Sequence, residues 1–321
     1  MITNNSGDSQ HTPSFTGRPL LKTRLIASTI IIGFLSGVIY LDIAYPLAGV
    51  GGLWLIPLLL LASLMAGSEL AGMCAEGGLS LNKRMVLVGI FIVQALTTVP
   101  LLMDIGNGYP ADCPIGRAGW PGIGLAAAFG LLMLTEMIQF REPGGVVAKI
   151  CNGTLVVLYA GFMPSFMILI RTFDGGGELG IVALISLVAI PKISDSAAYF
   201  TGKSIGKHKL APKLSPGKTV EGAIGAIVGG CLGAWLFFEV LAPKAVPAIS
   251  DLAVWKWLVY AIVLTITGML GDLAESLIKR DMQTKDSSSW LPGLGGILDV
   301  MDSITLSAVP AYLCWVSGLI S

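Results

Sequence analysis

Four carboxylates stand in two pairs near the C-terminal end of the sequence. Asp272 and Glu275 lie in the segment GDLAES, and Asp299 and Asp302 stand at the start of the last apolar run. Residues three apart share one face of a helix. Acids gathered in apolar surroundings repel one another unless a cation lies between them. The spacing therefore predicts a site for Mg²⁺, which prefers oxygen ligands and is usually completed by substrate phosphates.

The simpler alternative for the second pair is structural. Asp299 and Asp302 would then only complement the positive end of a helix dipole. Two pairs of acids with Lys279, Arg280 and Lys285 between them favour the metal site over this alternative.

A lysine-rich stretch, 191–222, lies upstream and reads PKISDSAAYFTGKSIGKHKLAPKLSPGKTVEG. Lysines beside a metal site are typical of proteins that bind a nucleoside triphosphate, because ammonium groups neutralise the phosphates while acids hold the ion. We predict Asp195 as a ligand of a second cation. The alternative is a basic anchor for anionic lipid head groups. The predicted substrate contacts in this stretch are Lys203, Lys207, Ser215, Lys218 and Thr219.

The segment SPGKT, 215–219, looks like part of a phosphate-binding P-loop. The complete motif needs a glycine five residues before Gly217, and Pro212 stands there. We also expect a membrane helix rather than a strand before it. The segment is therefore not a P-loop.

Glycine and proline interrupt the chain between the two acid pairs. The steps Pro292-Gly293 and Gly295-Gly296 break a helix and allow the backbone to approach a ligand closely. Exposed N–H groups ahead of a helix can hold phosphate oxygens. We therefore predict phosphate contacts at Gly295 and Gly296, with a plain turn as the alternative.

The composition indicates what must position these residues. Of 321 residues, 54% are hydrophobic and only 12% are charged, and the mean hydropathy is +0.79. Soluble domains are about 25% charged, so the chain is predicted to be an all-α polytopic membrane protein. The net charge of zero gives no general attraction for nucleic acid. The five cysteines form no CxxC pair, which argues against a zinc site or a disulfide scaffold.

Apolar runs predict about nine transmembrane helices. A polar tail, 1–24, precedes them, and 25–321 would form a single transmembrane catalytic domain with polar loops near 192–221 and 279–296. The predicted runs centre on 25–46, 51–69, 85–104, 120–140, 150–170, 178–200, 221–242, 256–278 and 297–319.

The basic residues predict the orientation. With the N-terminus in the cytoplasm, both polar loops face the cytoplasm and the C-terminus lies outside, in agreement with the positive-inside rule. All but four of the 20 Lys and Arg residues then lie on the cytoplasmic side. The four exceptions are Arg117, Arg171, Lys244 and Lys256.

The run 221–242 is rich in glycine at spacings of three and four. Small residues at this spacing form a close-packing face between membrane helices. They leave a homodimer open as an alternative to packing within the chain. The glycines are Gly222, Gly225, Gly229, Gly230 and Gly233.

Two segments resemble a known family. The pattern S-L-I-K-R-x4-K-D-x-S-x2-L-P-G-x-G-G-I-x-D-x-x-D, 276–302, resembles the signature of the phosphatidate cytidylyltransferases, also called CDP-diacylglycerol synthases. The stretch SDSAAYFTGKSIGKHKLAPKLSPGKTVEG, 194–222, is similar to a second motif of that family. Together the two blocks cover about 60 residues.

The resemblance implies an inner-membrane enzyme with its active site facing the cytoplasm. It would use CTP, phosphatidate and Mg²⁺ to make CDP-diacylglycerol and pyrophosphate. The implied metal ligands are Asp272, Asp299 and Asp302, with Asp195 added from the lysine-rich stretch. The implied catalytic residues are Asp272, Lys279, Arg280, Lys285, Asp286, Asp299 and Asp302.

Two positions depart from the family pattern. Leu294 stands where the family has His, and Val300 stands where it usually has Arg. Related alternatives are a CTP-dependent transferase or kinase acting on a polyprenol, phytol or ether lipid. A transporter is the alternative from another class, since acids in glycine-broken helices also build ion sites. That alternative predicts acids near the middle of the membrane and an inverted repeat.

Overall fold

The computed structural model describes residues 21–106, 108–284, 287–288, 290–291 and 295–320. Among them, nine spans are long and apolar enough to cross a membrane. Each overlaps one predicted run, so the predicted all-α polytopic membrane fold is confirmed. The spans are Ile26–Ala44, Leu55–Glu76, Lys83–Ile105, Gly116–Gln139, Val146–Thr172, Glu178–Ile205, Val220–Ala245, Val254–Asp281 and Ile297–Val316.

Two of the spans contain a π-helical turn. The span Val146–Thr172 contains the turn η2, and Val220–Ala245 contains η3. The main elements are α1 (Leu21–Ala44), α2 (Leu55–Glu76), α3 (Lys83–Ile105), α4 (Gly116–Gln139), α5 (Val146–Val157), η2 (Leu158–Phe162), α6 (Met163–Thr172), α7 (Glu178–Ile205), β1 (Lys209–Ala211), β2 (Ser215–Thr219), α8 (Val220–Trp235), η3 (Leu236–Leu241), α9 (Ala242–Ala245), α10 (Val254–Asp281) and α11 (Ile297–Val316). Two short 3₁₀ segments, η1 (Leu47–Gly49) and η4 (Pro247–Ile249), lie in connections between the helices.

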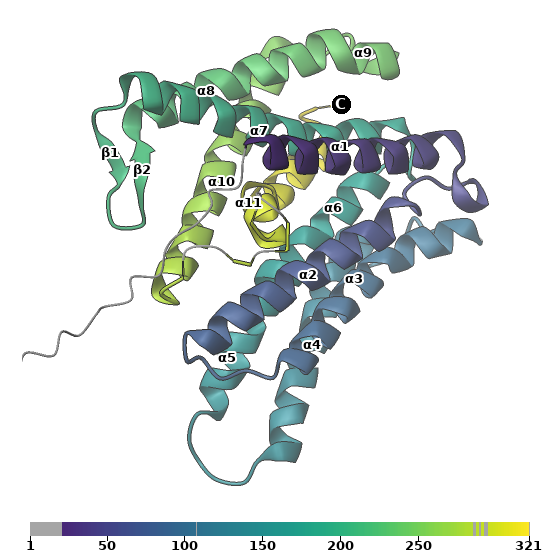
Figure 1. Ribbon diagram of the computed structural model, residues 1–321. Helices are drawn as coiled ribbons and strands as arrows, with labels where there is room; N and C mark the ends of the chain where they lie inside the picture. Colours follow the sequence, from purple (N-terminus) through teal and green to yellow (C-terminus); the bar gives the residue numbers. More distant parts are fainter. Residues whose placement is uncertain (1–20, 107, 285–286, 289, 292–294, 321) are drawn as a thin grey trace, which may run out of the picture.

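Helix α11 lies at the centre of the bundle (Figure 1) and packs against α2, α6, α7 and α10. Its buried Trp315 also satisfies its polar atom, as a buried Trp usually does. The Trp315 indole donates to the hydroxyl of Tyr260 at 3.2 Å, and that hydroxyl lies 2.8 Å from Ser186 Oγ. This network joins α11, α10 and α7 in the core.

The glycines of α8 pack closely against other helices of the same chain. A Cβ on Gly225 or Gly229 would collide with Thr201 or Ala197 of α7, and one on Gly230 would collide with Thr265 of α10. Close helix packing thus accounts for these glycines. The glycine spacing therefore gives no support to a homodimer.

The predicted polar loop at 192–221 is wrong in its first half. Helix α7 continues to Ile205, and a two-stranded antiparallel hairpin of β1 and β2 follows, with Lys209 opposite Thr219 and Ala211 opposite Ser215. The sequence after Pro191 contains no further proline before Pro212, so the helix can extend past its apolar part because its hydrogen bonds are internal. Lys192 and Asp195 therefore stand on a rigid helix.

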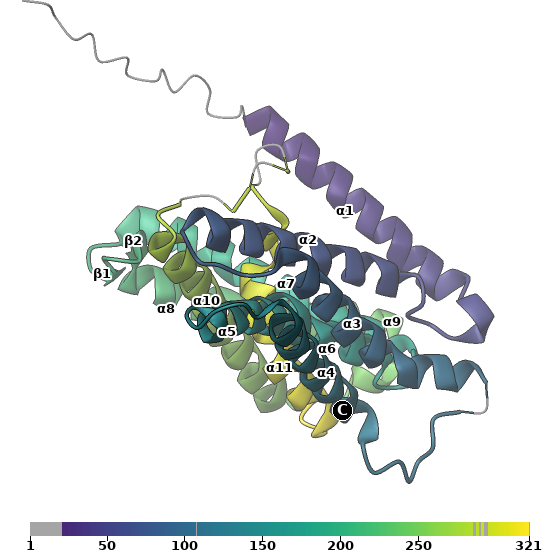
Figure 2. The same ribbon diagram turned by 90° about the horizontal axis from the view of Figure 1, so that it is seen from below.

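Helix α1 lies at the edge of the bundle alongside α2 (Figure 2). Over Ile26–Ala44 its only buried residue is Asp42. The Asp42 carboxylate pairs with Arg171 of α6 at 2.6 Å and accepts hydrogen bonds from the backbone N–H groups of Gly52 and Trp54. Asp42 and Arg171 are 1% and 2% exposed, so this ion pair ties α1 to the bundle.

We predict that Asp42→Asn lowers the unfolding midpoint of the protein in detergent. Removing one partner of a buried ion pair costs about 3–5 kcal/mol, because the other charge stays buried. Asp104→Asn is the matched control, since its pair with Arg117 is partly exposed and should contribute about 1 kcal/mol or less. The double variant Asp42→Leu with Arg171→Met should recover most of the loss. Equal midpoints for Asp42→Asn and wild type would contradict the prediction.

Candidate active site

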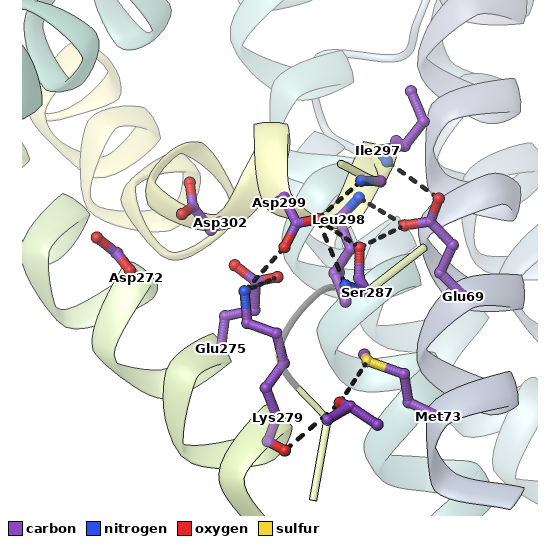
Figure 3. Close-up of polar contacts among 12 residues, drawn as sticks. Glu69, Met73, Asp272, Glu275, Lys279, Ser287, Ile297, Leu298, Asp299 and Asp302 are labelled. Carbon is purple, nitrogen blue, oxygen red and sulfur yellow. Dashed lines mark hydrogen bonds and ion pairs between the residues drawn. The ribbon is translucent and has the colours of Figure 1, made fainter. Parts of the chain in front are cut away.

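The candidate site lies at one end of the bundle, where α2, α7 and α10 end and α3, α8 and α11 begin. We call this end the polar end. The side chains that meet there come from α2, α7, β2, α10 and α11. Figure 3 shows the acids of α10 and α11 together with Glu69 of α2.

Lys279 connects the two predicted acid pairs. Its ammonium group lies 2.8 Å from Asp299 Oδ1 and 3.1 Å from Glu275 Oε1 (Figure 3). Glu275 and Lys279 are one helical turn apart on α10, which places both on one face. Glu275 is 1% exposed, so the lysine compensates a fully buried acid as well as joining α10 to α11.

Two further lysines neutralise the other acids. Lys218 Nζ at the end of β2 lies 2.7 Å from Asp272 Oδ2. Lys192 Nζ of α7 lies 3.3 Å from Asp302 Oδ1, 2.9 Å from Ser303 Oγ and 4.0 Å from Asp195 Oδ2. Three separate elements thus each supply a lysine to the polar end.

The predicted metal ligands divide into two groups. Asp272 and Asp302 stand on adjacent helices that approach closely, since a Cβ on Gly271 would collide with the Asp302 carbonyl oxygen. Both keep partly exposed carboxylates, and both are near enough to Asp195 to interact with it electrostatically. Within the described residues no three acid, His or Cys side chains converge on one point. Two carboxylates fit Mg²⁺, which commonly takes one or two of them plus phosphates.

Asp299 has a different environment. Its carboxylate accepts hydrogen bonds from the Gly296 N–H at 2.7 Å and from the Ser287 hydroxyl at 2.8 Å, in addition to Lys279. These contacts hold the start of α11. The role of Asp299 as a metal ligand stays a prediction.

Some predicted substrate contacts lie away from the acids. Arg280 is exposed and donates to the Leu214 carbonyl in the hairpin turn at 3.3 Å. Lys203 lies over the ring of Tyr199 at 5.6 Å on the exposed side of α7. Thr219 is buried, and its hydroxyl accepts from the Gly222 N–H as the N-cap of α8.

Two other predicted contacts lie on the hairpin side of the site. Lys207 is exposed, and its backbone N–H donates to Glu221 at 3.0 Å. Ser215 pairs with Ala211 in the hairpin and is half-buried. Neither side chain reaches the acids by a contact in the described structure. The segment SPGKT forms strand β2, and the short strand β1 precedes it, so the expectation of a membrane helix directly before this segment is wrong.

Gly295 and Gly296 come directly before α11. Gly295 has a φ of +90° and pairs with Leu291 in an isolated bridge, so a residue with a side chain would be strained there. Val300 is half-buried on α11. Lys285, Asp286 and Leu294 lie outside the described residues.

The sequence reasoning missed three groups at the polar end. Lys192 and the Ser303 N–H contact the Asp302 carboxylate, and Glu69 contacts Ser287 and the start of α11 from the end of the predicted run 51–69. A charged residue within a membrane span is itself a signal of function. That signal was present at Glu69, which has no acidic or basic neighbour within three residues.

Comparison with known proteins shows the family of the chain. The model of the family described as "Cytidylyltransferase family" matches residues 22–317. The chain belongs to the cytidylyltransferase family. The match covers every span and all the site residues named above.

Several curated relatives of this cytidylyltransferase carry the name phosphatidate cytidylyltransferase. The one from Bacillus subtilis is 38% identical over 56% of this chain and 62% of its own length. The one from Brucella suis is 40% identical over 49% and 54%. The one from Haemophilus influenzae is 38% identical over 70% and 76%. The matched segment thus spans somewhat more than half of the first two relatives.

We predict that Lys279→Met lowers the unfolding midpoint, because Glu275 is left buried without its counter-ion, at a cost of about 3 kcal/mol or more. Adding Glu275→Gln should restore most of the midpoint, since the buried charge is then removed as well. Lys203→Met, an exposed lysine on α7, serves as the control and should leave the midpoint unchanged. If the double variant is as unstable as Lys279→Met, the ion pair is not the reason for the loss.

Proposed function

We propose that this protein transfers the cytidylyl group of CTP to phosphatidate, giving CDP-diacylglycerol and pyrophosphate. The observation that carries the proposal is the set of three lysines, each paired with an aspartate at the polar end of a cytidylyltransferase-family bundle. The names of the curated relatives support the choice of phosphatidate.

The reaction needs positioning and charge neutralisation more than proton transfer. A phosphate oxygen of phosphatidate attacks the α-phosphorus of CTP, a new P–O bond forms, and the bond to the β-phosphate oxygen breaks. The phosphate nucleophile is already ionised, so no strong base is required. Lys192, Lys218 and Lys279 supply the positive charge that developing phosphate charge requires.

In the structure each of these lysines pairs with a carboxylate. A substrate phosphate is also an oxygen anion and can take the place of the carboxylate as the partner. An ammonium group carries three donors and can turn from a carboxylate to a phosphate without moving its helix. Lys285 and Arg280 would extend this set toward the triphosphate. The Lys192 side chain is 37% exposed, which leaves it reachable from the polar end. The Lys218 Nζ atom is itself buried beside Asp272, so it would contact a phosphate that displaces this carboxylate.

Asp272 and Asp302 would hold Mg²⁺, with Asp299 as a further ligand and Asp195 for a second cation. Bound there, Mg²⁺ supplies neutralisation of the triphosphate charge and orients the phosphates. The protein's own part is to place these carboxylates on adjacent, closely packed helices. The protein would lie in the inner membrane with its polar end facing the cytoplasm, because Lys and Arg are in excess on the cytoplasmic side of membrane proteins. The lipid tails of the substrate would remain in the bilayer.

A transporter is not favoured, because Asp299 and Asp302 lie in the first two turns of α11 and the other site acids lie in the halves of α7 and α10 nearer the polar end. A lipid kinase that uses CTP would transfer the γ-phosphate of CTP and not the cytidylyl group.

We predict that purified protein moves label from α-labelled CTP into phosphatidate-derived lipid, only with Mg²⁺ present. Label in lipid from γ-labelled CTP would instead show phosphorylation and overturn the proposal.

We predict that Asp302→Asn reduces the transfer at least about 100-fold without lowering the unfolding midpoint. Asn keeps the shape of Asp and can still accept from Lys192, so folding should be preserved while the charge for the cation is lost. Asp281→Asn, an exposed acid at the end of α10, is the control and should keep wild-type activity. A fully active Asp302→Asn enzyme would exclude Asp302 as a metal ligand.

A further inference from the structure

Glu69 is a buried carboxylate that the reaction chemistry does not use. It lies in the last third of α2, is 6% exposed, and points toward the start of α11 (Figure 3). Among the described residues it has four hydrogen-bond donors, and all are neutral groups. Oε1 accepts from Ser288 Oγ at 2.7 Å and Ile297 N at 3.0 Å, and Oε2 accepts from Ser287 Oγ at 3.1 Å and Leu298 N at 2.9 Å.

The contacts with Ile297 and Leu298 complete the N-terminus of α11. The first N–H groups of a helix have no partner inside the helix, and a side chain at the N-cap normally accepts from them. The N-cap of α11 is Gly296, which has no side chain. Glu69 provides the missing acceptor from a different helix, and its negative charge also complements the helix dipole.

The contacts with Ser287 and Ser288 fix the other end of the same loop. Residues 287–288 and 296–298 flank the glycine-rich part of the family signature. Glu69 therefore ties both sides of this loop to one point on α2.

Gly296 fits this arrangement independently. A Cβ at this position would collide with the Ser287 hydroxyl and with Glu69 Oε2. Its φ of −96° is open to any residue, so the close approach of Glu69, and not backbone strain, requires glycine here.

Glu69 is also linked to the lysine that joins α10 and α11. The Ser287 hydroxyl lies within hydrogen-bond distance of both Glu69 and Asp299, and Asp299 binds Lys279. A line of polar contacts therefore runs from α2 through the loop and α11 to α10. A change at Glu69 alters the position of Asp299 without touching a substrate.

We infer that Glu69 is a positioning residue for cytidylyl transfer, which sets the loop and the first turn of α11 from outside the site. The inference rests on the proposed function for its effect on the reaction. Its structural part, the capping of α11, does not depend on what the protein does.

The test compares Glu69→Gln, Glu69→Asp and wild type as full-length protein in detergent. Gln keeps the shape but turns one acceptor oxygen into an N–H₂ group that faces two donors, so half of the network is lost. We expect faster hydrogen exchange in peptides that span 295–300, about 10-fold at Ile297 and Leu298, with exchange in α4 and α8 unchanged. We also expect kcat, per folded molecule, to fall about 10- to 100-fold, as for a displaced active-site group, and Glu69→Asp to recover part of it.

Glu136→Gln is the matched control. Glu136 is a buried carboxylate of α4, 7% exposed, that pairs with Lys149 away from the loop, so its loss should change neither the exchange at 295–300 nor kcat per folded molecule. If Glu69→Gln is too unstable to purify, Ser288→Ala removes one of the four contacts and should raise exchange in the same peptides to a smaller extent.

Three results would overturn the inference. They are unchanged exchange at 295–300, a kcat within about twofold of wild type, or exchange that rises equally throughout the bundle, which would show a general loss of stability. If wild-type protein transfers no label from CTP, the proposed function fails by itself, and the exchange comparison still decides whether Glu69 holds the start of α11.

Discussion

The ammonium group of Lys279 is the contact on which the polar end depends. It lies between an acid on its own helix and an acid on α11, and α11 in turn packs against α2, α6, α7 and α10. A carboxylate as buried as Glu275 is costly without a partner. The lysine compensates it and joins the last two spans, which carry Asp272 and Asp302 on closely packed helices. The site is thus positioned by the same charges that would attract its substrate.

The sequence predicted the parts of the structure that depend on local pattern. Nine apolar runs were found because membrane spans must be long and apolar, and the two acid pairs were found because three-residue spacing is visible without a structure. The resemblance to the signature supplied the family, and the family match confirmed it. The metal, the second cation and the orientation in the membrane stay predictions.

What the sequence could not show was the partner of each charge. Glu69 meets Leu298 across 229 positions, and Lys192 meets Asp302 across 110. No spacing rule connects residues so far apart. The predicted run 178–200 overlaps the predicted loop near 192–221, and α7 continues through this overlap to Ile205, because a helix carries its own hydrogen bonds and can leave the membrane intact. Thr219, a predicted substrate contact, caps α8.

The buried pair of Asp42 and Arg171 has a consequence for how the bundle is assembled. The two residues are separated by 129 positions, and three complete spans lie in between them. Because α1 is synthesised before the other described spans, Asp42 has no counter-ion until the span that carries Arg171 has been made. Helix α1 therefore precedes the other described spans in synthesis but is among the later ones to be fixed in place, and its attachment reports that the spans from α1 to α6 have come together.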